Sequence, residues 1–84
     1  MVTVKLFGTI RTDARMKEMQ LDVSSVKDIY APLYDEILRH NPEPGFTLKD
    51  LKNCFIVVNG VRSNKRTALQ DGDEVYLLTA VAGG

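Results

Sequence analysis

The chain has 84 residues, 44% of them hydrophobic and 26% charged, and this length predicts a single domain with one modest core. Its 11 basic and 11 acidic side chains give a formal net charge of zero, and an acidic run at 71–74 follows Arg62, Lys65 and Arg66, which argues against a nucleic-acid-binding protein. No apolar run approaches the ~18–20 residues that span a bilayer and no signal-peptide pattern is present, so we expect a cytoplasmic protein without a membrane partner.

The chain begins with two predicted strands. Apolar residues fall at alternate positions from residue 2 to residue 10, which predicts a half-buried strand. Phe7 breaks the alternation and points to the opposite face, where we prefer local packing over display to a partner. Residues 11–14 are then interpreted as a turn, and a second alternation over 18–23 completes a predicted hairpin.

A long helix is predicted to begin at Ser25. Ser25 and Asp28 have the spacing of a capping box, and the apolar residues that follow recur every three or four positions, as in a helix with one buried face. Pro32 lies beyond the expected first turn, so we expect a kink or break near residues 28–30. The helix is expected to end at 40–41, because two prolines follow at once.

The second half of the chain is predicted to form a hairpin and a final strand. A single helical turn is expected over 46–52, and the nearly continuous apolar run over 53–58 is typical of an inner strand. Asn59-Gly60 is the pair that a type I′ hairpin turn favours. A tight Asp-Gly-Asp turn at 71–73 then leads into the last strand, over 75–79.

Isolated polar and thiol side chains give weaker indications of a site. His40 is a lone histidine near a helix C-terminus, where its ring suits the helix dipole, and we prefer this interpretation over a ligand or catalyst. Cys54 is interpreted as a core residue rather than a reactive thiol. Because it is the single cysteine, an internal disulfide and an iron–sulfur cluster within one chain are excluded. Asp71, Asp73 and Glu74 are expected to shape their turn. They lack the further oxygen ligands of a full calcium loop, so no metal site is predicted.

The chain ends in a tail of small residues, Ala80-Val81-Ala82-Gly83-Gly84. Two residues without Cβ give the end of the chain the smallest possible cross-section, which suits entry into another protein's active site. Five extended residues reach about 17 Å, enough to enter a catalytic cleft while the domain stays outside. We therefore divide the chain into a domain over 1–79 and a flexible tail over 80–84, with an inert, frayed terminus as the alternative.

The predicted elements follow the order ββαββ(β), which indicates an α+β domain with one main helix packed across one face of a mixed sheet. Four segments in this order resemble the MoaD/ThiS small sulfur carriers, which are ubiquitin-like β-grasp proteins, over essentially the whole length. These segments are VKLFGTIR at 4–11, VNG at 58–60, LQDGDEV at 69–75 and VAGG at 81–84. The resemblance implies that the first and last long strands lie side by side in the sheet centre. The Phe7…Arg11 pattern and the long helix are more similar to MoaD than to the shorter ThiS.

The resemblance implies a carrier rather than an enzyme, with no bound cofactor. A ubiquitin-activating-type enzyme would use ATP to adenylate the Gly84 carboxylate, and a sulfur donor would convert the acyl-adenylate to a thiocarboxylate. In a MoaD-like role the tail would enter the large subunit of molybdopterin synthase and donate sulfur to a pterin precursor in molybdenum cofactor biosynthesis. The partner-binding residues that the resemblance implies are Leu78, Ala80, Val81, Ala82 and Gly83.

Other functions fit the same tail. The chain could be a ubiquitin-like modifier that is joined to lysines of other proteins through Gly84. It could also carry sulfur to a thiazole or a tRNA base, or be a β-grasp interaction module with an inert tail. The sequence leaves the final sulfur acceptor open.

Overall fold

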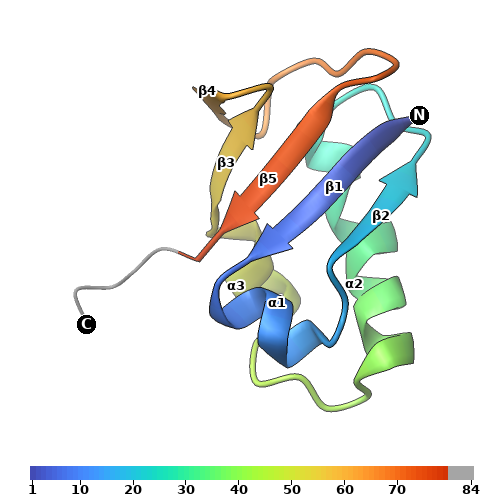
Figure 1. The fold of residues 1–84 in the computed structure, drawn as a ribbon, viewed down its shortest axis with the longest axis vertical. Helices are drawn as coiled ribbons and strands as arrows, with labels where there is room; N and C mark the ends of the chain where they lie inside the picture. The colour runs from blue at the N-terminus through green and yellow to red at the C-terminus, as the bar shows by residue number, and fades with distance from the viewer. Residues whose placement is uncertain (80–84) are drawn as a thin grey trace.

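The sheet of this domain has five strands: β1 (Val2–Phe7), β2 (Glu18–Leu21), β3 (Phe55–Val58), β4 (Val61–Ser63) and β5 (Glu74–Leu78). In this computed structural model, which describes residues 1–79, the strands lie in the order β2-β1-β5-β3-β4. β1 runs parallel to β5, and the other neighbouring strands are antiparallel (Figure 1). The predicted mixed sheet is therefore confirmed, and so is the placement of the first and last long strands side by side.

The helical segments lie behind and below the sheet in the view of Figure 1. They are α1 (Thr9–Ala14), the 3-10 helix Val26–Asp28, α2 (Tyr30–His40) and α3 (Leu48–Lys52). α2 is the main helix, and it buries Tyr30, Leu33 and Ile37 against the sheet. The strands contribute Val2, Val4, Leu6, Leu21, Ile56, Val58, Val75 and Leu77 to the same core. The predicted α+β fold with one main helix is confirmed, and no helix within residues 1–79 is long and apolar enough to cross a membrane.

The segment between the first two strands differs from the prediction. β1 ends at Phe7 rather than at residue 10, because Gly8 takes a φ of 72° and a ψ of −147° that leave the extended conformation. Ile10 and Ala14 then lie one helical turn apart on the buried side of α1. The antiparallel pairing of β1 and β2 is as predicted, but a helix joins them where a hairpin turn was expected.

The start of the main helix also differs from the prediction. Ser25 caps no backbone N–H, and its hydroxyl instead donates to backbone carbonyls of residues 65 and 67, at 3.4 and 3.5 Å. The 3-10 turn gives way to α2 at Ile29, inside the predicted break. Pro32 is the third residue of α2, where a missing backbone N–H breaks no intrahelical bond. The capping box at Ser25 is therefore wrong, whereas the break and the end of α2 at His40 are confirmed.

The sharp turns of the second half are confirmed. Asn59 and Gly60 have φ values of 51° and 82°, as a type I′ turn requires, and they join β3 to β4. Asp73 accepts from the Gln70 N–H at 2.8 Å and from the Asn59 side-chain amide at 2.9 Å, which ties the two turns together. These two bonds, with the Gln70 bond the larger cause, hold the pKa of Asp73 below its ordinary value. β3 has a neighbour on each side, as expected of an inner strand.

Candidate functional site

The tail that should carry the chemistry follows β5. Ala80, Val81, Ala82, Gly83 and Gly84 lie outside the residues that the structure describes, so their roles and the division of the chain at residue 79 stay predictions. Leu78 is the predicted site residue that is described, and it is the last residue of β5. Because β5 is the central strand, Leu78 and Thr79 stand at the middle of one end of the sheet.

The sheet has two chemically different faces. Side chains alternate along each strand, and one set faces the helices to form the core. None of the helices within residues 1–79 crosses the opposite face (Figure 1). On this face Phe7, Leu78 and Phe55 occupy paired positions on β1, β5 and β3. We call these three side chains the apolar row, and Phe55 within it is 40% exposed.

A second row of side chains lies beside the apolar row, with Lys5, Tyr76, Val57 and Arg62 in paired positions. The Tyr76 ring packs against Phe7 with 4.9 Å between ring centroids, and Lys5 Nζ lies 5.8 Å from the centre of the same tyrosine ring. The Tyr76 hydroxyl donates to Glu74 at 3.0 Å. Local packing of Phe7 is therefore confirmed, although Phe7 remains only partly buried. The face combines apolar contact area with polar groups at its margin, as protein interfaces do.

Thr79, the base of the tail, is held against the start of α1. Its hydroxyl lies 3.3 Å from the hydroxyl of Thr9. A Cβ added at Gly8 would lie 3.2 Å from Thr79 Oγ1, and the φ of 72° at Gly8 is one that residues with side chains rarely adopt. Gly8 therefore sets how closely Thr79 approaches the end of the sheet.

The substitution Gly8→Ala is expected to lower the free energy of unfolding by about 1–3 kcal/mol, because alanine is strained in this backbone conformation and its methyl group crowds Thr79. Urea denaturation at pH 7 measures the change. Gly60→Ala is the matched control, since Gly60 also has a positive φ but nothing lies within 4 Å of a Cβ built there. A loss at Gly8 no larger than the loss at Gly60 would show that the contact with Thr79 has no energetic role.

A hollow of about 500 Å³ lies beside Thr79, between α1 and α3. Two carboxylates line it, and backbone donors bind both. Asp13 accepts from the Gly45 N–H at 2.6 Å, and Asp50 accepts from the Thr47 N–H at 2.9 Å. The Thr47 hydroxyl accepts from the Asp50 N–H in return, which completes a capping box at the start of α3. Both carboxylates thus hold the walls of the hollow in place.

Cys54 lines the same hollow but is 8% exposed, which confirms it as a core residue. Burial raises the pKa of its thiol to about 11, and the nearby Asp50 carboxylate is a smaller cause. The hydroxyl of Tyr30 is also buried, with no hydrogen-bond partner among residues 1–79, and burial raises the pKa of Tyr30 to about 12. A thiol that stays protonated is a poor nucleophile, so the geometry favours the structural interpretation of Cys54.

We expect Cys54 of the folded protein to react with iodoacetamide at pH 7.5 at least about 100-fold more slowly than free cysteine, because its raised pKa leaves little thiolate and burial restricts access. The time course of the intact mass measures the rate. The same protein in concentrated urea is the control and should react like free cysteine. A fast reaction of the folded protein would contradict the core assignment and favour a role for the thiol in sulfur chemistry.

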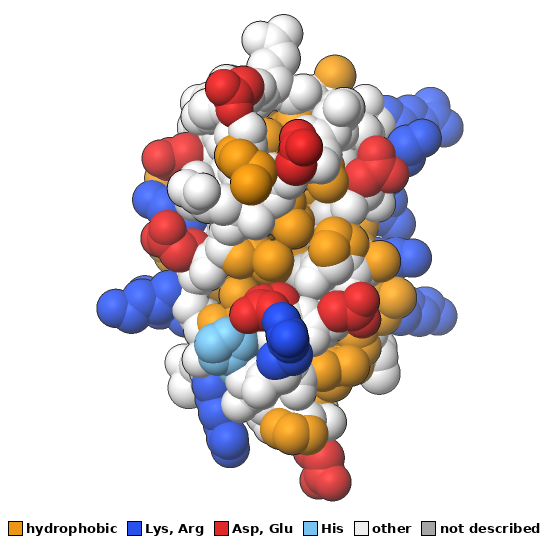
Figure 2. Space-filling view, turned by 90° about the vertical axis from the view of Figure 1, so that its right-hand side faces the viewer, with side chains coloured by type: hydrophobic (Ala, Val, Ile, Leu, Met, Phe, Trp, Pro, Cys, Tyr) orange, Lys and Arg blue, Asp and Glu red, His pale blue; other side chains and the backbone are white. Residues whose placement is uncertain are grey.

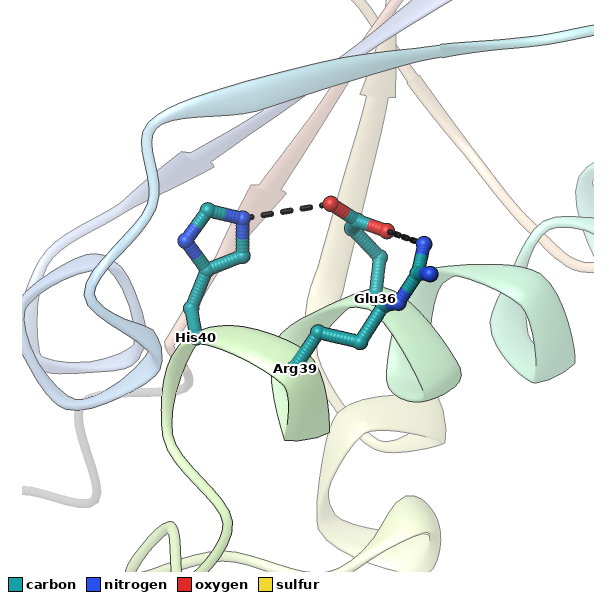
Figure 3. Close-up of polar contacts among 3 residues, drawn as sticks. All are labelled: Glu36, Arg39 and His40. Carbon is teal, nitrogen blue, oxygen red and sulfur yellow. Dashed lines mark hydrogen bonds and ion pairs between the residues drawn. The ribbon is translucent and has the colours of Figure 1, made fainter.

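His40 belongs to a small charged cluster on the surface of α2 (Figure 3). Glu36 Oε2 lies 3.2 Å from His40 Nε2, and Glu36 Oε1 accepts from Arg39 at 3.4 Å. Figure 2 looks onto this side of the molecule and shows the single histidine beside charged side chains of both signs. Exposed pairs of this kind contribute about 0–1 kcal/mol each, and residues 1–79 contain no group of three potential metal ligands. His40 therefore has the surface position at the end of α2 that the sequence predicts.

A family model matches nearly the whole chain: the model of the ThiS family covers residues 4–84. The chain belongs to the ThiS family. The small archaeal modifier protein 1 (SAMP1) from Methanosarcina acetivorans is 28% identical, with a TM-score of 0.72 over 99% of this chain and 95% of that one. A chain in the complex of subunits 1 and 2 of the molybdopterin-converting factor from Helicobacter pylori is 29% identical, with a TM-score of 0.64 over 99% and 97%.

A third similar structure is a chain in the BexX/CysO complex of Amycolatopsis orientalis, which is 25% identical with a TM-score of 0.63 over the full length of both chains. No curated protein sequence matches this chain significantly. Membership of the ThiS family confirms the resemblance to small ubiquitin-like sulfur carriers and the β-grasp fold. The likeness to SAMP1 and that to the converting factor differ by one percentage point of identity, so they do not single out MoaD within the family.

Two residues of the exposed face of this ThiS-family chain, Phe55 and Tyr76, were not predicted from the sequence. Tyr76 lies between Glu74 and Leu78 in a strict alternation with the buried Val75, so the alternation rule could have placed it on the outer face. Phe55 was hidden, because it begins an unbroken apolar run in which no polar residue marks the face that points outward.

Proposed function

We propose that this chain is a sulfur carrier whose Gly84 carboxylate is converted to a thiocarboxylate. The observation that carries the proposal is the match to the ThiS family, which extends through the Gly-Gly end. The exposed sheet face beside Thr79 gives further support, because it offers contact area to a protein that acts on the tail. In this proposal the partner enzyme consumes ATP, and this chain provides the tail and the docking surface.

The proposed reaction has two steps, both at the Gly84 carboxyl group. A carboxylate oxygen attacks the α-phosphorus of ATP, and pyrophosphate leaves. The product is a mixed anhydride in which AMP is a far better leaving group than the original oxygen. Hydrosulfide, or a donor that delivers an equivalent sulfur, then attacks the carbonyl carbon, and AMP leaves with the bonding electron pair. With hydrosulfide, loss of one proton completes the thiocarboxylate.

The apolar row gives the activating enzyme a place to hold the domain during this reaction. Leu78 is its central member, next to Thr79 at the base of the tail. Apolar surface covered by a partner contributes about 25 cal/mol per Å², and a tail of five residues reaches about 17 Å from Thr79. The enzyme can therefore bind the sheet face while its active site lies about 17 Å from Thr79, within reach of the extended tail. Ala80, Val81, Ala82 and Gly83 would line the channel to that site.

The intact mass of the protein tests the carrier proposal. After incubation with ATP, sulfide and the ubiquitin-activating-type enzyme of the same genome, the mass should rise by about 16 Da, the exchange of one carboxylate oxygen for sulfur. A reaction without ATP is the control and should leave the mass unchanged. Absence of a gain with an enzyme that activates another ThiS-family carrier would refute the proposal.

The acceptor that we propose is a pterin precursor, with this chain as the small subunit of molybdopterin synthase. Support comes from the Helicobacter pylori structure, which is a complex of two subunits of a molybdopterin-converting factor. The thiocarboxylated chain should then form a stable complex with the large subunit and release sulfur only when the precursor is present. Release to a thiazole precursor or a tRNA instead would reassign the pathway and leave the carrier chemistry intact.

A second candidate function is protein modification through an isopeptide bond from Gly84 to lysine. The likeness to SAMP1, a modifier protein by name, favours this function, because its TM-score of 0.72 is higher than the 0.64 and 0.63 of the chains from the converting-factor and BexX/CysO complexes. Trypsin is a poor probe, because Arg66 is the last basic residue and an 18-residue remnant, 67–84, would stay on the target. A protease that cleaves after Val81 leaves Ala-Gly-Gly on lysine. Such remnants in the proteome would support this function, and their absence would count against it.

A further inference from the structure

A second hollow, of about 240 Å³, opens at the β4 edge of the sheet. Its lining residues come from the end of α3, the start of β3, and the end of β4 with the residues that follow it. β4 is the edge strand of the sheet (Figure 1). Three basic side chains line it, Lys52, Arg62 and Lys65, together with the polar residues Asn53, Ser63 and Asn64. No acidic residue is among the lining residues. We call this hollow the basic pocket.

The chain has a net charge of zero, but the residues that line this pocket carry a local excess of positive charge. The acidic run at 71–74 follows the basic residues in sequence, but its side chains are bound elsewhere. Asp71 contacts the Met1 amine, while Glu74 lies 3.8 Å from Lys5. None of the four ion pairs within residues 1–79 involves Lys52, Arg62 or Lys65. The acidic run therefore does not neutralise the basic pocket by direct pairing.

The basic side chains are attached to ordered backbone. The central guanidinium carbon of Arg62 lies 4.2 Å from the centre of the Phe55 ring, a cation–π contact that restrains the guanidinium group. The carbonyl of Lys65 accepts from the Lys27 N–H at 3.0 Å, and the Asn64 side chain accepts from the Arg66 N–H at 2.8 Å. A planar guanidinium held in this way suits a carboxylate, which it can bind through two parallel hydrogen bonds.

The basic pocket is continuous with the apolar row. Phe55 belongs to both, and Arg62 pairs with Val57 on the same sheet face. A protein that covers the apolar row therefore also reaches the pocket. We propose that the basic pocket binds an aspartate- or glutamate-rich segment of the partner that docks on the apolar row. This inference rests on the proposed function, since that partner is the enzyme that acts on Gly84.

An acidic peptide tests the pocket without any activation of the tail. The ¹⁵N-labelled protein is titrated at about 0.1 M NaCl, where charges within about 10 Å still interact, with a capped hexaglutamate peptide and with hexaglutamine as the neutral control. We expect shifts of the amides of residues 52, 55 and 62–65 with hexaglutamate only. The double variant with Lys52→Gln and Lys65→Gln should bind hexaglutamate about tenfold or more weakly than the original protein. Arg15→Gln with Lys17→Gln removes two exposed charges outside the pocket and should change the affinity less than about twofold.

Three results would overturn the proposal. The first is the absence of shifts at the pocket, and the second is binding that the Lys52 and Lys65 substitutions leave unchanged. The third is tighter binding of inorganic pyrophosphate or of an eight-nucleotide thymidine strand, which would assign the pocket to a phosphate-bearing ligand. The spectra also show whether each variant is folded. Because the peptide needs no thiocarboxylate, this test can fail while the mass gain at Gly84 succeeds, and the reverse.

Discussion

A chain that lacks Gly84 is expected to acquire no sulfur. Truncation leaves a carboxylate on Gly83, about 3.3–3.6 Å short of its original position on the same tail. Reacting atoms must lie about 3–3.5 Å apart and be aligned, so a displacement of one residue removes the carboxylate from reach of ATP in the partner's active site. Intact mass after incubation with ATP, sulfide and the activating enzyme should show the starting mass alone.

Two measurements make the truncation informative. The urea midpoint of the truncated protein should equal that of the full chain, because Gly84 has no side chain and the truncation leaves intact the hydrophobic core that the structure describes within residues 1–79. A chain that lacks Ala82 but keeps Gly83 and Gly84 separates tail length from terminal residue. If the length of the tail determines whether sulfur is acquired, this variant should also show no gain in mass. Sulfur transfer by the chain without Gly84 at the full rate would disprove the role of the terminal residue.

The central strands and the main helix could be predicted because their pattern is periodic. Residues from β1 and α2 show their buried face by spacing alone, and Asn59-Gly60 has a conformational preference that few other pairs share. The helix α1 could not be predicted in the same way. Its six residues are too few to show a helical period, and Ile10 continues the strand alternation by coincidence. Gly8 was counted as a strand residue, although its positive φ is what ends the strand.

The site was only partly predictable for a similar reason. The tail of small residues can be recognised directly in the sequence, and Leu78 could be assigned as a site residue once the family resemblance was recognised. The exposed face depends on pairing between strands that are far apart in sequence. Phe7 meets Leu78 and Leu78 meets Phe55 only because β5 inserts between β1 and β3. The basic pocket has the same origin, since Lys52 and Arg62 come from different elements. Net charge, summed over the chain, gives no information about such a cluster.

Leu78→Asp is expected to lower kcat/KM for activation of the tail by about 100-fold or more. The substitution places a carboxylate at the centre of the apolar row, next to Phe7 and Phe55. An unpaired charge covered by a partner costs several kcal/mol, and each 1.4 kcal/mol corresponds to about tenfold in kcat/KM. Release of pyrophosphate by the activating enzyme, measured against the concentration of the carrier, gives this value.

Matched variants separate docking from folding in this experiment. Val61→Asp adds the same charge to β4 at a side chain that is 65% exposed and outside the apolar row, and we expect less than about threefold loss there. Leu78→Met keeps the volume and the apolar character, so it should retain near-normal activation. Leu78 is only partly buried in the domain, and Leu78→Asp should therefore still unfold cooperatively in urea. If the folded Leu78→Asp protein is activated as well as Val61→Asp, the enzyme does not dock on the apolar row, and Gly84 must reach it from another face.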